Sequence, residues 1–340
     1  MRNGGTDLNP DTKAKGIIVK SIGGLYGVRP VPYCDDDSVF LCRARGVFRH
    51  ESISPLVGDT VTFERDTGDG IKRERETKSA DHVITEILPR RNALIRPPLA
   101  NLTHIFVVIP ATHPEPDLLT ADKLISIAEY NGIEPVIIIN KCDLDGDAAR
   151  RIAGIYSPHF ATHLVSKNDA DSISALRDFI GMLKNDDGST VISAFAGVSG
   201  AGKSTIMSLL FPSLSFKSGE LSAKIARGKN TTRHSELYAF GTGNSVCFIA
   251  DTPGFSLIDF TRFNFYPSAE LPFLFREFGD YLPNCRYTSC THTSEDNCGV
   301  IIALRSGLIA ESRHESYKVI YADLKKKPDW KRIKELESGN

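Results

Sequence analysis

The stretch VISAFAGVSGAGKST, residues 191–205, decides the fold of the central part of this chain. Its first six residues are apolar and favour a buried strand, and the residues after Lys203 open an apolar segment typical of a helix. Between them, GVSGAGKS fits the pattern G-x-x-x-x-G-K-S of a phosphate-binding loop, in the strand–loop–helix context that this motif requires. We therefore predict a phosphate site made by Gly197, Val198, Ser199, Gly200, Ala201, Gly202, Lys203, Ser204 and Thr205.

The residue types of this loop suit a nucleoside triphosphate. Glycines let backbone N–H groups wrap a phosphate, which side chains would obstruct. We expect Lys203 to bridge the β- and γ-phosphates and Ser204 to bind Mg²⁺, while the helix N-terminus adds partial positive charge. The alternative is a glycine-rich turn that binds nothing, and it does not account for the flanking strand and helix.

Two segments further along the chain fit the same site. DTPG, residues 251–254, follows the apolar run SVCFIA, so we expect Asp251 to contact Mg²⁺ and Gly254 to face the γ-phosphate. RGKNTTRH, residues 227–234, is polar and predicts a switch loop that closes on Mg²⁺ through Thr232, in preference to Thr231. Taken alone, the first segment is a common turn and the second a solvated basic loop.

NKCD, residues 140–143, follows the apolar run PVIIIN at the end of another predicted strand. The Asp143 carboxylate can accept both N1–H and N2–H₂ of guanine, a donor pair that adenine lacks. Asn140 can bond the ring N7 and brace the loop, and the aliphatic stem of Lys141 can cover the base. Ser166, after the predicted strand THLV, can place backbone groups near guanine O6. Beside a phosphate loop, NKCD therefore favours GTP over ATP.

The pattern of apolar and polar residues changes along the 340 residues of the chain, which suggests about two or three domains. We expect residues 1–13 to be a flexible tail. Residues 14–95 hold short β-branched segments and predict a barrel, with an OB-fold favoured. Residues 96–267 alternate strands and helices, as a parallel α/β sheet does. Residues 268–340 predict a mainly helical zinc-binding domain with a helix over 271–282 and a basic C-terminal tail.

The composition is that of an ordinary globular protein, with 41% hydrophobic and 24% charged residues. A net charge of -1 means that any nucleic-acid surface must be a local patch, and the basic residues of the barrel segment fit a solvated surface or an RNA groove equally well. No apolar run approaches the ~20 residues that span a bilayer, and the N-terminus lacks a signal core, so we expect a cytoplasmic protein with no membrane partner.

Three of the seven cysteines gather near the C-terminus in CRYTSCTHTSEDNC. Three thiolates and one imidazole complete a tetrahedral zinc site and leave no open position for catalysis, so we expect a structural Zn²⁺ site. Its predicted ligands are Cys285, Cys290, His292 and Cys298. The odd cysteine count argues against a disulfide framework.

The order of the motifs is NKCD, Ser166, phosphate loop, switch loop and DTPG, whereas the usual order begins with the phosphate loop. Joining the usual ends and opening the chain elsewhere gives this order, a circular permutation that leaves the strand ends of the sheet together. With PRRNALIRPPLANLTH before the α/β segment, the chain resembles the ribosome small-subunit-dependent GTPase A family over about residues 14 to 320. The resemblance implies an OB-fold, a permuted GTPase domain, a zinc domain, and the 30S subunit with its 16S rRNA as partner.

The chain departs from related enzymes where the attacking water must be positioned. The Gln that follows DxxG in Ras-type enzymes is Phe255 here, and the His that the resemblance implies before the paired threonines is Asn230. His234 could replace that His or be a surface residue. We therefore expect a monomeric, Mg²⁺-dependent GTPase without a DNA partner, slow alone and stimulated by the small subunit. Its catalytic residues would be Lys203, Thr232, Asn230 and His234.

Two other interpretations remain open at the level of the sequence. One is a nucleotide-gated rRNA-binding scaffold whose hydrolysis is incidental, which the loss of the Gln and His side chains favours. The other is an ATPase that acts on nucleic acid, in which Asp143→Ala would leave the nucleotide preference unchanged, whereas we expect guanine selectivity to be lost. For a GTPase of the small subunit, the barrel, the zinc segment and the basic tail are the candidate rRNA-binding parts. Taken alone, the tail is more typical of a solvated helix, because it also carries Asp329, Glu335 and Glu337.

Overall fold

The computed structural model describes residues 13–31, 39–50, 53–65, 80, 82–95, 97–184, 190–212, 235–240, 246–251, 263–326 and 331. The chain divides into two compact units. The first comprises residues 1–102, 184–192 and 229–253, and the second comprises residues 103–183, 193–228 and 254–340. Within the ranges described, no helix has both the length and the apolar character needed to cross a membrane.

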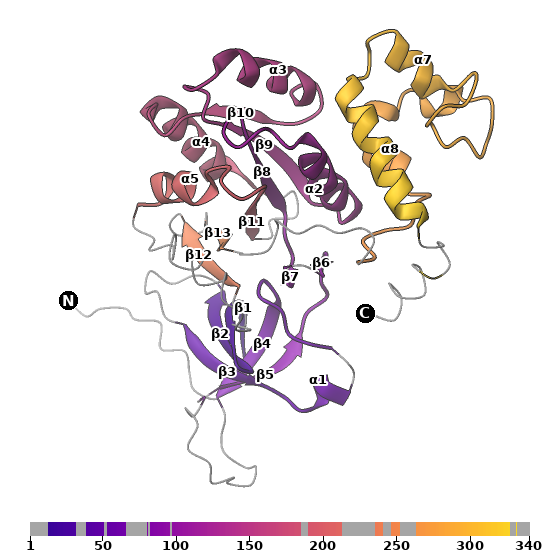
Figure 1. Cartoon of the computed structure of the whole chain (residues 1–340). Helices are drawn as coiled ribbons and strands as arrows, with labels where there is room; N and C mark the ends of the chain where they lie inside the picture. Colours follow the sequence, from indigo (N-terminus) through magenta and orange to yellow (C-terminus); the bar gives the residue numbers. More distant parts are fainter. Residues whose placement is uncertain are drawn as a thin grey trace, which may run out of the picture. The chain divides into compact units, whose positions relative to one another are not determined.

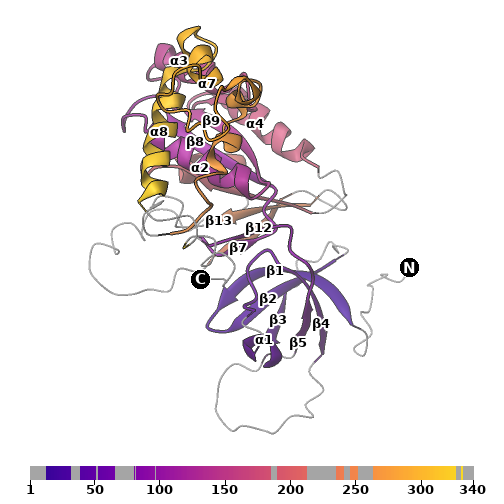
Figure 2. The same cartoon turned by 90° about the vertical axis from the view of Figure 1, so that its right-hand side faces the viewer.

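The first unit contains a closed barrel of short strands (Figures 1 and 2). Strand β1 pairs with both β2 and β4, which closes the order β1-β2-β3-β5-β4, and all pairs are antiparallel except β3 with β5. This order is that of an OB-fold, as predicted. A Gly23-Gly24 turn joins β1 to β2, and a short helix, α1 (Val47–His50), follows β3. The barrel strands are β1 (Ala14–Ile22), β2 (Leu25–Val31), β3 (Phe40–Ala44), β4 (Thr60–Arg65) and β5 (His82–Ile87).

Four more strands lie wholly within the first unit. They are β6 (Ala93–Leu94), β7 (Leu99–Ala100), β12 (Glu236–Phe240) and β13 (Cys247–Asp251). β6 pairs with β7, and β12 pairs antiparallel with β13. β12 also pairs with β1, where Lys20 lies opposite Glu236 and the two side chains form an ion pair of 2.7 Å.

The second unit is built on a parallel sheet in the order β10-β9-β8-β11 (Figure 1). Pro110 at the end of β8 is in register with Asn140 at the end of β9, which is in register with Val165 at the end of β10. The carboxyl ends of these strands therefore share one edge, where α/β sheets bind ligands. The strands are β8 (His104–Pro110), β9 (Glu134–Asn140), β10 (Thr162–Val165) and β11 (Val191–Ala196).

Helices pack on this sheet, and three of them begin at an aspartate. The carboxylates of Asp117, Asp145 and Asp169 accept backbone N–H groups of the first turns of α2, α3 and α4. The fourth helix, α5, begins instead at Gly202, directly after the predicted phosphate loop. The helices are α2 (Leu118–Tyr130), α3 (Gly146–Tyr156), α4 (Ala170–Met182) and α5 (Lys203–Leu210).

The prediction of one helix over residues 271–282 is wrong. The segment forms separate 3₁₀ turns, η2 (Leu271–Leu274), η3 (Arg276–Phe278) and η4 (Leu282–Asn284). Between the first two, Phe275 is extended and its buried ring packs against Phe278 and Tyr317, so tertiary packing outweighs the helical pattern. Two α-helices follow, α7 (Gly299–Arg305) and α8 (Glu311–Lys325).

Helix α8 packs against α2 through a buried ionic cluster. The Arg313 guanidinium donates to Asp122 of α2 at 2.6 Å and to Glu277 of η3 at 2.5 Å. The Tyr156 hydroxyl of α3 donates to the same Asp122 oxygen at 2.8 Å, and the Phe275 ring lies 4.4 Å from the guanidinium carbon. Because all of these groups are buried, the cluster fixes the C-terminal helices to the parallel sheet.

Candidate nucleotide-binding site and metal cluster

The predicted phosphate loop lies between the end of β11 and the start of α5, and its shape needs glycine at both ends. Gly197 has a φ of +138°, and a Cβ there would meet the Val108 carbonyl oxygen of β8 at 2.4 Å. Gly202 has a φ of +97°, and a Cβ there would meet Asn140 Nδ2 at 2.1 Å. The motif glycines therefore allow both a left-handed backbone and close contact with neighbouring strands.

Lys203, the first residue of α5, turns its side chain back onto the loop. Its Nζ donates to the carbonyl oxygens of Gly197 and Val198, each at 2.9 Å. Burial lowers the pKa of Lys203 from its ordinary value of 10.5. The ammonium thus lies against the loop whose backbone N–H groups would bind phosphate, which is the position that a P-loop lysine needs.

The NKCD segment is joined to the phosphate loop by two side chains. The buried Asn140 amide donates from Nδ2 to the Ala201 carbonyl oxygen at 2.8 Å. Lys141, at a φ of +64°, donates from Nζ to the Gly200 carbonyl oxygen at 2.9 Å and to the His113 carbonyl oxygen. The predicted base-binding and phosphate-binding segments are therefore one connected structure in the second unit.

Asp143 is exposed, and neighbouring donors hold its carboxylate. The side chains of Ser166 and Asn168 bond this carboxylate and lower the pKa of Asp143 below its ordinary value of 3.8, against a smaller opposing effect of burial. The Asn168 Nδ2 lies 2.8 Å from Asp143 Oδ2. An ionised carboxylate at this edge of the sheet can accept a pair of N–H donors from a ligand.

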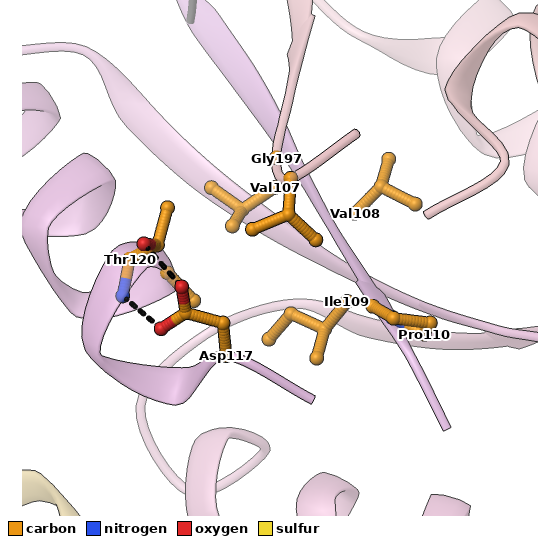
Figure 3. Close-up of a pocket in the computed structure, with 9 residues that line it drawn as sticks. Val107, Val108, Ile109, Pro110, Asp117, Thr120 and Gly197 are labelled. Carbon is orange, nitrogen blue, oxygen red and sulfur yellow. Dashed lines mark hydrogen bonds between the residues drawn. The ribbon is translucent and has the colours of Figure 1, made fainter. Parts of the chain in front are cut away.

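A small pocket lies beside the phosphate loop but is not the nucleotide site. It is lined by β8, by the start of α2 and by Gly197 and Val198, and it has room for about one water molecule. Figure 3 shows Asp117 next to Thr120 at the start of α2, where the carboxylate accepts from Thr120 N at 2.9 Å and from Thr120 Oγ1 at 2.6 Å. This aspartate is therefore occupied as the N-cap of α2.

The four predicted metal ligands come together in the second unit. The ligand atoms of Cys285, Cys290, His292 and Cys298 all lie within 4.8 Å of one another. His292 turns Nδ1 toward the thiols, at 3.4 Å from Cys285 Sγ and 3.5 Å from Cys298 Sγ. Three sulfurs and one imidazole nitrogen at these separations could hold a metal ion, and the donor set suits a tetrahedral site.

Helix α8 and a local carboxylate hold the backbone of this cluster. His314 Nε2 bonds the His292 carbonyl oxygen at 2.8 Å, and the Tyr317 hydroxyl donates to the Thr291 carbonyl oxygen at 2.8 Å. Glu295 accepts from Thr291 N at 2.7 Å and from Thr293 N at 3.0 Å. The ligand loop is thus braced from outside, as metal sites commonly are.

Several predicted site residues lie outside the described residues. They are Asn230, Thr231, Thr232, His234, Gly254 and Phe255. Asp251 is the last residue of β13 in the first unit, and its side chain is also outside the description. Ser204 and Thr205 are exposed in the first turn of α5.

Two residues that contact the site, Asn168 and His113, were not singled out from the sequence. Asn168 bonds Asp143, and the carbonyl of His113 accepts from Lys141. Asn168 lies two residues after Ser166, and His113 lies three residues after the end of β8. Only their positions in the sequence could have indicated these contacts, because both residues follow strands whose carboxyl ends meet at one edge of the sheet.

A parallel sheet whose NKCD segment precedes its phosphate loop, with both joined at one edge, defines the class of P-loop GTPases with a permuted motif order. A model of the RsgA GTPase family matches residues 87–261, and one of the RsgA N-terminal domain matches residues 15–71. The chain belongs to the RsgA GTPase family and is a GTP-hydrolysing enzyme.

Individual relatives agree with this assignment over nearly the whole chain. The chain is 38% identical to the "Small ribosomal subunit biogenesis GTPase RsgA" of Ruminiclostridium cellulolyticum, over 93% of this chain and 95% of that protein. It is 37% identical to the protein of the same name from Halalkalibacterium halodurans, over 92% of this chain and 97% of that one.

Solved structures show the same fold. The crystal structure of YjeQ from Thermotoga maritima matches with a TM-score of 0.72 and 30% identity, over 92% of this chain and 99% of that one. YloQ, described as a circularly permuted GTPase, matches with a TM-score of 0.70 and 28% identity, over 95% of this chain and 99% of that one. The predicted architecture of barrel, permuted GTPase fold and C-terminal helices with a Cys₃His cluster is therefore confirmed.

Proposed function

We propose that this GTPase binds the small (30S) ribosomal subunit and acts in its late maturation, with GTP binding and hydrolysis timing its association and release. Relatives at 38% and 37% identity carry the name of a small ribosomal subunit biogenesis GTPase. The observation that supports guanine-nucleotide binding most directly is the bond from Asn140 to the Ala201 carbonyl, which joins the base-binding segment to the phosphate loop.

Hydrolysis would transfer the γ-phosphoryl group of GTP to water and release GDP and phosphate. Lys203 would bridge the β- and γ-phosphates, and Ser204, Thr232 and Asp251 would hold the Mg²⁺ that neutralises the developing charge. Phe255 carries no hydrogen-bonding group to orient the water, so Asn230 or His234 would have to do so. The GTPase should consequently be slow until the small subunit completes or orders the site.

Each other part of the chain has a place in this proposal. Zn²⁺ on the Cys₃His cluster would be structural, because its protein ligands fill a tetrahedral shell. The barrel of residues 14–95, the zinc-binding domain of residues 268–340 and its basic tail would contact 16S rRNA, with residues 96–267 as the GTPase domain. We propose that the protein acts as a cytoplasmic monomer.

Nucleotide selectivity tests the base-binding part of the proposal. The full chain should bind GTP and GDP with Mg²⁺ much more tightly than ATP, and Asp143→Ala should reduce that preference by about 10- to 100-fold, since two hydrogen bonds to a charged acceptor are lost. Calorimetric titration with each nucleotide measures both. Equal affinities for GTP and ATP in the wild-type chain would rule out guanine recognition by NKCD.

The pH dependence of this binding follows from the ionisation of Asp143. The carboxylate is the form that accepts guanine, and its pKa is below 3.8. Guanine binding should therefore be retained above that pKa and lost as the pH falls through it, so this group should cause no change in GDP affinity between about pH 8 and pH 5. A titration curve of GDP affinity with a midpoint near neutrality would point to another group.

Binding to ribosomal particles tests the partner. The chain should sediment with purified 30S subunits when a non-hydrolysable GTP analogue is present, and less when GDP replaces it. Purified 50S subunits are the matched control. Equal sedimentation with both subunits, or no difference between the nucleotides, would contradict a GTP-timed association with the small subunit.

A further inference from the structure

We propose that Asn168 is a positioning residue for guanine recognition, because it holds the Asp143 carboxylate in the orientation that the two N–H donors of guanine require. This inference rests on the proposed guanine site and adds a residue to it. Asn168 lies in the loop between β10 and α4, and its Nδ2 donates to Asp143 Oδ2 at 2.8 Å. Asn168 belongs to neither the NKCD motif nor the phosphate-loop motif.

Asn168 acts on the carboxylate through Ser166 as well. Its backbone N–H donates to Ser166 Oγ at 3.0 Å, so one acceptor position of that hydroxyl is already filled. The Ser166 hydroxyl in turn bonds the Asp143 carboxylate. A hydroxyl has a single proton, and a carboxylate can only accept, so that proton is directed at Asp143. The Asn168 side chain therefore holds Asp143 directly, while its backbone N–H contacts Ser166, the second donor to that carboxylate.

Holding the carboxylate matters because its terminal torsion is otherwise loosely determined. The χ2 of an aspartate samples a broad, roughly two-fold distribution, and Asp143 is exposed. Guanine presents N1–H and N2–H₂ in one plane, so both oxygens must lie in that plane at once. The carboxylate offers about four acceptor positions, which leaves room for guanine beside Ser166 and Asn168. Ordering it before the ligand arrives avoids an ordering cost on binding.

The fold of the loop does not depend on the Asn168 side chain. Asp169 caps α4 by accepting from Asp171 N at 3.1 Å and Ser172 N at 3.4 Å. The Asp169 N–H donates to the Ser166 carbonyl at 3.1 Å, and Ser166 is buried. Asn168 itself is exposed, and its contribution to the loop comes from the backbone N–H that any variant keeps. Substitutions of its side chain should thus alter Asp143 and leave the chain folded.

The test is the affinity of the full chain for GTP and for ATP, with Asn168→Ala and the isosteric Asn168→Asp. Asn168→Ala should weaken GTP binding by about fivefold and leave ATP binding unchanged. Asn168→Asp should weaken GTP binding further, because a second carboxylate repels the first. The matched control is Asp171→Asn, which changes an exposed side chain in the first turn of α4. It should bind GTP as the wild type does.

A double-mutant cycle separates positioning from a general effect. In an Asp143→Ala background, Asn168→Ala should cause no further loss, since the group that it positions is gone. Three results would each overturn the inference. The Asn168 variants could bind GTP as tightly as the wild type does, or they could lose as much affinity for ATP as for GTP. Asn168→Ala could also weaken GTP binding as much in the Asp143→Ala background as in the wild type. Failure of the wild-type chain to prefer GTP over ATP would overturn the proposed guanine site and this inference with it. A wild-type preference that both Asn168 variants keep would overturn the inference alone.

Discussion

At Gly202 a left-handed backbone and a close side-chain contact coincide. Its φ is +97°, and the Asn140 amide nitrogen lies only 2.1 Å from the place that a Cβ would take. That amide also donates to the Ala201 carbonyl. Because Gly202 has no side chain, the base-binding and phosphate-binding segments can touch at this position. The glycine of the motif is therefore needed by both segments.

Gly202→Ala should separate these segments. The added methyl group must displace the Asn140 side chain, and an alanine at this φ costs about 1–2 kcal/mol. We expect GTP affinity to fall by at least about tenfold, measured by calorimetric titration. Gly154→Ala is the control, because Gly154 lies in α3 and an added methyl group there would have no other atom within 4 Å. That variant should bind GTP normally and be more stable by about 0.5–1 kcal/mol. Normal GTP binding by Gly202→Ala would contradict the contact.

At the scale of elements, α8 connects the metal cluster to the GTPase fold. One residue, Arg313, bonds Asp122 of α2, and the next, His314, bonds the carbonyl of His292. Burial disfavours the charge of Arg313, yet Asp122 and Glu277 raise its pKa above the ordinary value, so the guanidinium stays charged. The packing of α8 therefore depends on the buried Arg313 guanidinium, whose charge Asp122 and Glu277 balance.

Arg313→Ala should strongly destabilise the second unit. It leaves Asp122 and Glu277 buried without their partner, which costs about 3–5 kcal/mol for a broken buried ion pair. Urea unfolding followed by far-UV circular dichroism measures this loss. Lys318→Ala is the control on the same helix, because it removes only an exposed pair with Glu315 and should cost less than about 0.5 kcal/mol. Equal stability of the two variants would show that the buried cluster contributes nothing.

Removal of the metal should affect the C-terminal elements first. The purified chain should contain about one zinc per molecule, since four ligands form one site. A strong chelator under reducing conditions should remove it, lower the Tm and speed amide hydrogen exchange in residues 285–305, because metal binding here supplies folding energy. Cys298→Ser should abolish zinc binding. Cys247→Ala changes a buried thiol outside the cluster and should keep the zinc. A metal-free wild-type chain of unchanged Tm would refute a structural metal.

At the scale of the whole molecule, the predictable features were those with a local signal. GVSGAGKST and NKCD carry their chemistry in short segments, and alternating strands and helices predicted the parallel sheet. The cysteine spacing predicted the cluster that the structure brings together. The order of these motifs then identified the permutation, which no single motif contains.

Features that depend on tertiary contacts could not be predicted in this way. The residues 271–282 have a helical pattern, yet Phe275 becomes extended because its ring packs against Phe278 and Tyr317. Asn168 and His113 belong to no sequence motif. Their contacts form only because β8, β9 and β10 end at one edge of the sheet. The roles of Asn230, Thr232 and His234 stay predictions, since these residues lie outside the described ranges.

The residues that position the attacking water can be tested by substitution. If Asn230 stands where a water-positioning His is needed, Asn230→His should raise GTP turnover of the isolated chain, because an imidazole can accept a proton near neutral pH. If His234 acts instead, His234→Ala should lower turnover in the presence of small subunits. Unchanged turnover in both variants would exclude both residues. The matched control is His159→Ala, in the α3–β10 connection.

The most direct test of the whole account is GTP turnover by the purified chain with Mg²⁺, measured with and without 30S subunits. The account predicts slow turnover alone, because Phe255 cannot orient water, and an increase of about tenfold or more when 30S subunits are added. An equal amount of 50S subunits should have no such effect. Turnover that stays the same with 30S subunits, in a chain shown to bind GTP, would contradict a GTPase timed by the small ribosomal subunit.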